Sequence, residues 1–536
     1  MHPDQFISFF ADPFSNAEPL FAVSTRDRRP SRMVGLPQLL EEPGLAITFQ
    51  TDRLVEGLRL RGLKAPNLVD IRQALQLASG LPRREFDESD WRVSKWLRLT
   101  KLSPAEQELY FGLLDGIKAR PDQRELERLL LHMSEATADV WEGISAELER
   151  IGELERFLRI EIPVQQLMYE RQMKGLAVDL PKSHEFLSEA KSQKYKAMLN
   201  VGAALQHNPT GLTYRNVLPL IGKTDASNIA DFSGSRNLES YFKMAANRSH
   251  FARDFRAMIN ANRNIKSLLS FTTSGGRIFP AFDTMGTVTA RIQTSSPNVQ
   301  QLRRSFRGAL CADPGMHCTY LDFAQYEPGV LAQFVGPGRY RELYNAGDVY
   351  TSLSNAVFGD TLKRDLSKQV FIAFCYGMEL ESIARLLEGS WHSETPSGYA
   401  RSVCEFFEQF PELTNFKRKC EADLRQSGFV ATMMGNRRVR RNSGGLTRKE
   451  RGWAMNQVIQ GTASLIFKDV LLSLARILGS NSILLPIHDA VWLQVPKDGM
   501  TAEEFQTLAA NEMRSIFRKW CPDIAIRVKV SAFDES

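Results

Sequence analysis

The chain has 536 residues, of which 43% are hydrophobic and 24% charged, and this composition predicts a globular protein of two to four domains. A net charge of +6 permits a polyanionic partner, while the lack of a 20-residue apolar run and of a basic, apolar leader predicts no membrane association and no signal peptide. Six scattered cysteines form no CxxC pair, which argues against a zinc site or disulfide framework and favours a reducing, cytoplasmic setting.

Residues 1–150 are predicted to form a small α/β domain. Short β-like runs lie at 20–23 and 45–49. Amphipathic patterns typical of helices follow, for example at 52–63 and 121–134.

Residues 151–275 are predicted to be almost entirely helical. Apolar residues recur at helical spacing over 160–173, and Gly175 stands where a helix would end on a glycine. The stretch 205–238 is rich in Asn, Thr, Gly and Ser and predicts loops, and a helical region follows at 240–270. Two long helices around a polar tip indicate a projecting arm.

Residues 276–536 mix strands and helices. A short apolar strand at 319–321 is expected to end at Asp322, and runs at 482–487 and 490–495 predict a hairpin with His488 and Asp489 at its turn. The long helical patterns between these strands cover 361–389, 397–425 and 450–478.

The two aspartates suggest a metal site. Phosphoryl transfer from a nucleotide uses two magnesium ions about 3.5–4 Å apart, held by a few carboxylates, phosphate oxygens and waters. A strand ending in Asp322 that faces a turn carrying Asp489 could place two carboxylates on one side of a sheet. Taken alone, an Asp at a strand end is more often a turn former or a helix cap.

A stripe of side chains recurs every four residues at Arg364, Lys368, Ile372 and Tyr376. Two cations one helical turn apart can grip a triphosphate, and Tyr376 could offer its ring to a base. The alternative for an isolated segment is a solvated charged face with Tyr376 in the core. Arginines also cluster at 303–307 and 437–441, which suits phosphate backbones or a solubilising surface.

Together and in order, these segments resemble the conserved motifs of family A DNA polymerases, typified by bacterial DNA polymerase I. The family's TGRLSSSxPNLQN, DYSQIELR, RxxxKxxxFGxxYG, GRRR, IQGTA and VHDE motifs are matched at 289–300, 321–327, 364–377, 435–438, 459–463 and 487–490. Similar matches at 160–163 and 175–179 extend the resemblance toward the start of the family's thumb.

The resemblance implies a two-metal mechanism with Mg²⁺, for which Mn²⁺ can substitute. Asp322, Asp489 and the Phe323 carbonyl would hold the ions, and Lys368 would assist catalysis. Glu327 would exclude the ribose 2′-hydroxyl. The nucleotide-binding set would comprise Arg364, Lys368, Ile372, Tyr376, Glu327, Gln325 and Tyr350, and the DNA-binding set Arg291, Gln460, His488, Asn298, Gln300, Arg437 and Arg438.

The implied architecture is an α+β right-hand polymerase that acts as a monomer on primer–template DNA and deoxyribonucleoside triphosphates. No processivity partner is indicated. The family's 5′-nuclease domain is expected to be absent. The implied parts are a thumb at 151–275, a palm at 276–345 and 480–536, and fingers at 346–479.

Several positions depart from the family's pattern. Ile372 replaces a stacking Phe, Ala490 replaces the acid beside Asp489, and Tyr350 replaces a His. Pro328-Gly329 replaces Leu-Arg, and Ala290 replaces a Gly. These changes predict lower activity or altered selectivity.

The N-terminal region resembles, more weakly, the family's 3′–5′ exonuclease domain after loss of its acids. Ser24 and Arg26 would stand at the DxE acids, Asp52 at a second Asp, and Ala136 at the last Asp. An arginine at a magnesium ligand inverts the charge there, so the hypothesis is a catalytically dead exonuclease-like domain. The alternative is an unrelated small α/β domain.

Two other classes of function remain open. Ala490, Ile372 and Pro328 fit a decayed polymerase fold that only binds DNA. A single-subunit RNA polymerase shares the palm, although Glu327 favours deoxyribonucleotides. The missing proofreading acids and the compact size suggest a phage or mobile-element source acting in the host cytoplasm.

Overall fold

The computed structural model describes residues 5–12, 17–27, 30–41, 44–82, 97, 100–221, 238–246, 249–383 and 398–534. The chain divides into two compact units. Unit 1 comprises residues 1–174, 282–293 and 317–530, and unit 2 comprises residues 175–281, 294–316 and 531–536.

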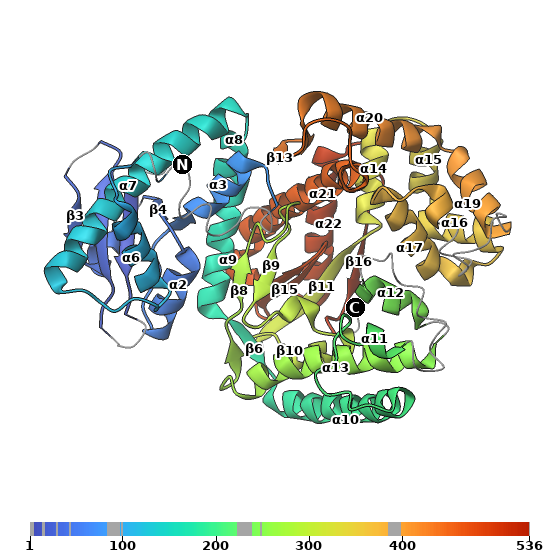
Figure 1. Ribbon diagram of the computed structural model, residues 1–536, viewed down its shortest axis with the longest axis horizontal. Coiled ribbons are helices and arrows are strands. Elements are labelled where there is room, and N and C mark those ends of the chain that lie inside the picture. Colours follow the sequence, from blue (N-terminus) through green and yellow to red (C-terminus); the bar gives the residue numbers. More distant parts are fainter. Residues whose placement is uncertain are drawn as a thin grey trace. The chain divides into compact units, whose positions relative to one another are not determined.

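A five-stranded mixed sheet forms the N-terminal part of unit 1, in the order β3-β2-β1-β4-β5 (Figure 1). Strand β1 (Gln5–Phe10) pairs antiparallel with β2 (Leu20–Thr25) and parallel with β4 (Ala46–Thr48), which is parallel to β5 (Leu68–Asp70). The runs predicted at 20–23 and 45–49 are therefore strands. The central strand β1 was not predicted, because all six of its residues are buried and its sequence QFISFF does not alternate.

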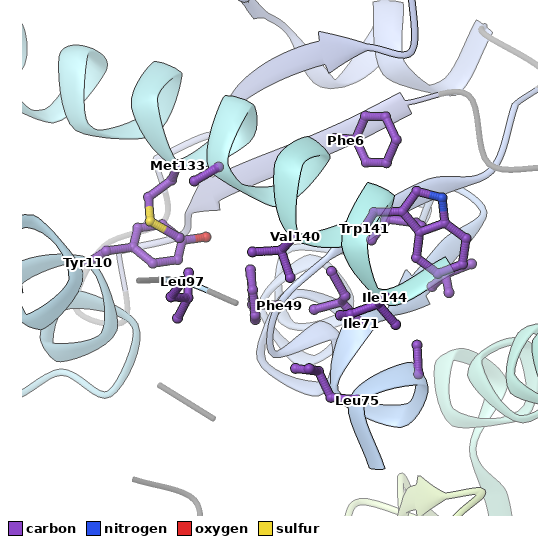
Figure 2. Close-up of a cluster of buried hydrophobic side chains, with 14 of the residues drawn as sticks. Phe6, Phe49, Ile71, Leu75, Leu97, Tyr110, Met133, Val140, Trp141 and Ile144 are labelled. Atoms are coloured by element: carbon purple, nitrogen blue, oxygen red, sulfur yellow. The ribbon is translucent and has the colours of Figure 1, made fainter. Parts of the chain in front are cut away.

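Helix α7 (Gln123–Arg150) covers this sheet and is twice as long as the predicted helix at 121–134. Asp122 begins it by accepting a hydrogen bond from the Glu125 backbone N–H at 2.9 Å. Figure 2 shows the hydrophobic core beneath it, with Met133, Val140, Trp141 and Ile144 of α7 gathered with Phe49, Ile71 and Tyr110. The other elements of this part are β3 (Arg32–Val34), α1 (Leu36–Glu41), α2 (Thr51–Leu60), α3 (Ile71–Ser79) and α6 (Pro104–Leu114).

The helical segment predicted at 160–173 begins as a π-helix, η1 (Phe157–Glu161), after α8 (Leu154–Arg156), and continues as α9 (Ile162–Lys174). Gly175 ends it with φ +69°, and a Cβ there would meet the Ile278 carbonyl oxygen at 2.5 Å. Only glycine fits that backbone, so the predicted helix end is confirmed.

A buried cluster of four charges ties this segment to helix α21 (Arg448–Leu478). The Arg156 guanidinium contacts Glu153 at 2.8 Å and Glu161 at 2.6 Å, and Lys468 contacts Glu161 at 2.5 Å. All four side chains are 1% exposed or less, and their charges sum to zero.

Unit 2 is built on two long helices, α10 (Leu180–Leu205) and α13 (His250–Thr272), which lie side by side (Figure 1). A small antiparallel sheet of order β10-β6-β7 lies at their base. The helical region expected at 240–270 is two helices, and part of the loop stretch at 205–238 falls outside the described residues. The remaining elements are β6 (Leu176–Val178), α11 (Leu218–Ile221), α12 (Leu238–Ala245), β7 (Arg277–Ile278), η3 (Val299–Gln301), η4 (Arg304–Ala309) and β10 (Leu310–Cys311).

A second sheet has the order β14-β15-β11-β16. Strands β14 (Ile483–Ile487) and β15 (Ala490–Pro496) form the predicted antiparallel hairpin, with Ile487 opposite Ala490. Strand β11 (Met316–Ala324) does not end at Asp322 as predicted but continues to Ala324. Its apolar residues after the acid, Phe323 above all, remain buried and keep the strand in the sheet.

Of the three helical patterns predicted between these strands, the one at 450–478 is confirmed by α21, and the other two form shorter helices. Helix α17 (Arg364–Cys375) ends where Gly377 takes φ +77°, well before residue 389, and residues 384–389 lie outside the described part. The residues of the pattern at 397–425 form two helices, which are separated before Pro411. The hairpin of β12 (Phe429–Thr432) and β13 (Gly435–Val439) was not predicted. The others are α14 (Tyr326–Val335), α15 (Arg339–Ala346), α16 (Val349–Phe358), η5 (Thr361–Lys363), α19 (Gly398–Glu408), α20 (Pro411–Ser427), η6 (Ser480–Ser482), α22 (Ala502–Trp520), β8 (Ala281–Asp283), β9 (Gln293–Ser295) and β16 (Arg527–Ser531).

Helix α21 is the one helix among the described residues that is long and apolar enough to cross a membrane. Its most apolar stretch is 83% buried inside the protein, as in the core helix of a globular domain. Packing against the rest of unit 1 therefore accounts for its hydrophobicity.

Candidate active site

Asp322 and Asp489 lie at one edge of the second sheet. Asp322 is on β11, and Asp489 is in the turn between β14 and β15. The Phe323 backbone N–H donates to the Asp489 carbonyl at 3.4 Å and fixes the turn against β11. His488, which precedes Asp489, is exposed and takes φ +56°. The two predicted metal ligands are thus brought together.

The electrostatics of this pair favour a cation. Burial, followed by repulsion from Asp322 and Glu327, raises the pKa of Asp489 to about 7, while Arg291 opposes the rise. Two partly buried carboxylates that repel each other are stabilised by a divalent ion between them. No cluster of three or more His, Cys, Asp or Glu ligands occurs within the described ranges. A magnesium site here would therefore rest on two carboxylates, the nearby Phe323 carbonyl, water and phosphate oxygens.

A hydrogen-bonded network surrounds Glu327, at the start of α14. Its carboxylate pairs with Arg291 and accepts from the Gln460 amide at 3.3 Å. The same amide nitrogen donates to the Tyr376 hydroxyl at 2.7 Å, and Thr289 donates to the Gln460 amide oxygen at 2.8 Å. The sequence predicted four of these five side chains from separate motifs, and the fold joins them in one network.

Ala290 stands in this network where the family has glycine, and its backbone takes φ +56°. This left-handed region is strained for a residue with a Cβ. The Ala290 carbonyl accepts a hydrogen bond from the Ser464 hydroxyl of α21 at 2.7 Å, which helps to hold the conformation.

The stripe on α17 is only partly available to a ligand. Arg364 donates to Asp348 at 2.7 Å and 3.1 Å, and its guanidinium lies 5.2 Å from the Tyr350 ring centre. Burial alone would raise the pKa of Asp348, but the hydrogen bonds from Arg364 hold that pKa below its ordinary value. Lys368 is exposed. Arg364 would thus have to leave Asp348 to reach a triphosphate, whereas Lys368 points into solvent-accessible space.

Other predicted nucleotide-binding residues are engaged in packing. The Gln325 amide oxygen accepts from the Val349 backbone N–H at 2.7 Å and links α14 to α16. Tyr350 is 4% exposed and packs edge-on to Phe371. Ile372 is half-buried, and Tyr376 is 44% exposed. Direct nucleotide contact by Gln325 and Tyr350 stays a prediction.

The predicted DNA-binding residues outside the network are dispersed. Asn298 and Gln300 belong to unit 2, where both side chains accept hydrogen bonds from Thr294. Arg438 is 9% exposed and lies 4.1 Å from the centre of the Trp453 ring, so its charge is largely covered. Arg437 is half-buried beside Phe429.

Two residues that the sequence reasoning did not select also shape the site. Asp348 caps α16 by accepting from the Thr351 backbone N–H at 2.9 Å and also holds Arg364. The Tyr326 hydroxyl donates to the Ala463 carbonyl at 2.7 Å and links α14 to α21. An Asp directly before a helix is a cap signal, and a prediction of α16 from the sequence would have pointed to Asp348.

Gly377 sits at a close approach, because a Cβ there would lie 2.5 Å from the Gly452 Cα, and its φ is +77°. Gly377→Ala is therefore expected to lower the free energy of unfolding by about 2–4 kcal/mol, from backbone strain plus overpacking. Gly359→Ala is the matched control, since Gly359 has φ +65° but open space around its Cβ position. It should lose only about 1 kcal/mol. Urea denaturation of both variants measures the difference, and equal losses would contradict the close approach.

The raised pKa of Asp489 makes stability depend on pH. Its folded pKa of about 7 lies above its ordinary value of 3.8, so the unfolded chain releases the proton first and the free energy of unfolding falls between pH 4 and 7. Asp489→Asn removes this loss. Without divalent metal at pH 8 the variant should be more stable than wild type by roughly 2 kcal/mol. Thermal unfolding at pH 5 and pH 8 tests this, and a difference that does not grow with pH would contradict it.

The DNA polymerase family A model matches residues 233–534, more than half of the chain. The chain belongs to DNA polymerase family A. It is 27% identical over 276 residues to DNA polymerase I of Chloroflexus aurantiacus, a match that covers 48% of this chain and 28% of that protein. It is 23% identical over 448 residues to DNA polymerase I of Mycobacterium tuberculosis, which covers 77% of this chain and 48% of that protein.

Similarity of fold to a solved structure covers almost the whole chain. The structure of the POL domain of Pol1 from M. smegmatis, in complex with DNA primer-template and dNTP, superposes with a TM-score of 0.73 at 19% identity, covering 99% of this chain and 95% of that one. The expected mixed α+β polymerase fold is therefore confirmed. The chain spans about a third of the length of the Chloroflexus and Thermus polymerases that it matches.

Proposed function

We propose that this chain is a template-directed DNA polymerase that adds deoxyribonucleotides to a primer 3′-hydroxyl by a two-metal mechanism with Mg²⁺ or Mn²⁺. The observation that carries the proposal is the Asp322–Asp489 pair, whose mutual repulsion suits bound cations, beside the Glu327 network. Primer–template DNA and deoxyribonucleoside triphosphates would be its ligands. We assign 151–275 to the thumb, 276–345 and 480–536 to the palm, and 346–479 to the fingers.

The chain's own residues would divide the work. Asp322, Asp489 and the Phe323 carbonyl would hold the ions, which when bound activate the primer hydroxyl and neutralise the triphosphate. Lys368 would approach the triphosphate as a point charge, and Arg364 would exchange the Asp348 carboxylate for phosphate oxygens. The Glu327 carboxylate, held by Arg291 and Gln460, would occupy the space of a ribose 2′-hydroxyl.

Primer extension tests this function. Wild type with Mg²⁺ should extend a primer with deoxyribonucleotides and discriminate against ribonucleotides, whereas equal use of both would favour the RNA polymerase alternative. A lack of extension in both Mg²⁺ and Mn²⁺ would favour a decayed fold that only binds DNA. Glu327→Ala should weaken the sugar discrimination more than the extension rate.

We also propose that the N-terminal domain is an exonuclease-like domain without activity, so that the polymerase lacks proofreading. The positions aligned with three of the four exonuclease acids, Ser24, Arg26 and Ala136, all line one cavity of about 670 Å³. Asp52, aligned with the fourth, is ion-paired with Arg72 at 2.6 Å. Primer degradation by the pure protein that Asp52→Ala abolishes would overturn this proposal.

A phage or mobile-element source, with action in the host cytoplasm, is a further proposal that rests on the missing proofreading acids. The genes flanking this sequence in its genome would test it, since a set of virion or transposition genes is expected around it.

A further inference from the structure

A cavity of about 520 Å³ in unit 1 lies away from the aspartate pair, between the turn that follows α7 and the hairpin of β12 and β13. Figure 1 shows α8 and β13 close together, and the Arg437 backbone N–H donates to Glu153 at 3.3 Å across this junction. Three cations from both sides line the cavity, Arg150, Arg156 and Arg437, together with the apolar side chains of Met433 and Met434. One carboxylate, Glu155, also lines it and is ion-paired with Arg159 at 2.8 Å.

The charge of Arg437 is not neutralised. Its guanidinium lies 5.1 Å from the Phe429 ring centre, its buried Nε has no hydrogen-bond partner, and no ion pair to it occurs in the described part of the chain. Burial lowers the pKa of Arg437 and Arg150 lowers it further, while Glu153 and Glu147 oppose this. A half-buried cation with an unsatisfied donor is costly unless an anion binds to it.

The other two arginines differ in availability. Arg156 is 1% exposed and is already neutralised by Glu153 and Glu161. Arg150 is 69% exposed and pairs with Glu147 on its own helix, so its guanidinium can turn toward an anion in the cavity. The site thus offers one fixed and one mobile guanidinium beside an apolar wall.

We propose that this cavity binds one unpaired nucleotide of a single-stranded DNA segment, with its phosphate on Arg437 and Arg150 and its base against Met433 and Met434. The assignment to DNA rests on the proposed polymerase function. The volume suits a nucleotide, the arginines suit a phosphate, and flexible methionines accept any base. The hairpin is also hydrogen-bonded to α21, because the Met433 backbone N–H donates to the Thr462 hydroxyl at 3.2 Å. Thr462 is two residues from Gln460 in the sequence.

Binding measured by fluorescence anisotropy, with EDTA and no nucleotide, tests the cavity separately from catalysis. The probes are one labelled primer–template with a 5′ template overhang of roughly ten nucleotides, enough to reach past one binding site, and the same duplex with blunt ends. Arg437→Gln and Arg150→Ala should each weaken overhang binding roughly threefold to tenfold and reduce the salt slope by about 0.7. The affinity for blunt DNA should be unchanged in Arg150→Ala, and in Arg437→Gln it should fall less than the affinity for overhang DNA.

Arg128→Ala is the control, because Arg128 is another exposed arginine of α7 that does not line the cavity. Equal losses on blunt and overhang DNA, or no loss on either, would overturn the proposal. If inorganic phosphate or deoxyadenosine monophosphate displaces the labelled DNA, but the variants bind overhang DNA as well as wild type does, the cavity is a site for free anions instead. If wild type fails to extend primers while both variants lose overhang binding, the polymerase function fails and the cavity assignment stands.

Discussion

Asp489→Ala is expected to lower the single-turnover rate of primer extension by at least about 10³-fold, which corresponds to roughly 4 kcal/mol of transition-state stabilisation. The variant removes one of the two carboxylates that the sheet edge brings together, and the next residue in the sequence, Ala490, is not an acid that could replace it. Asp322→Ala should have an effect of the same size, because each acid alone leaves the pair incomplete.

Rapid-quench measurements on wild type and variants with saturating primer–template give the chemical step directly. Asp498→Ala is a suitable control, since Asp498 is exposed in the turn after β15 and should leave the rate unchanged. DNA affinity should remain within a few-fold in both aspartate variants, because neither carboxylate attracts a polyanion. A residual rate above about one tenth of wild type in Asp489→Ala would remove this residue from the metal site.

Lys468→Met is expected to lower the free energy of unfolding by about 3–5 kcal/mol. Burial lowers the pKa of Lys468, and its contact with Glu161 opposes this effect. Without the ammonium, Arg156 is the one cation of the cluster, and it must balance both Glu153 and Glu161. The cluster would then carry an uncompensated negative charge in a medium that solvates it poorly.

Urea denaturation of Lys468→Met measures this loss, and the double variant Glu161→Gln with Lys468→Met should recover part of it, because the cluster is neutral again. Arg159→Ala removes a surface ion pair with Glu155 on the same segment and should cost less than about 1 kcal/mol. A similar small loss in Lys468→Met would mean that water reaches the cluster.

The sequence predicted those parts of the fold whose signals are local. The β14–β15 hairpin follows from two apolar runs around His488 and Asp489, and Gly175 ends its helix as a left-handed glycine should. Strand β1 and the β12–β13 hairpin gave no comparable signal, because one is buried on both faces and the other reads as a basic cluster. Tertiary pairing, not the local pattern, makes both of them strands.

The site was predictable as a set of residues but not as an arrangement. Motif spacing identified Glu327, Gln460 and Tyr376 separately, yet their shared hydrogen bonds depend on how α14, α17 and α21 pack. The pairing of Arg364 with Asp348 could not be read from a helical stripe either, since Asp348 lies on another element. The comparisons establish the family and fold, while the residue roles stay predictions.

Helix α21 makes different demands on each of its sides. Gln460 turns toward the Glu327 network, Thr462 holds the β12–β13 hairpin, Ser464 holds Ala290, and Lys468 completes the charge cluster. Helix α22, by contrast, buries one stripe, which comprises Phe505, Ala509, Ala510, Met513 and Phe517. In a scan of all single substitutions, tolerance along α22 should therefore rise and fall with a period of 3.6 residues. Between residues 454 and 474 of α21, by contrast, almost every position should be intolerant, because no face of this helix is free of contacts.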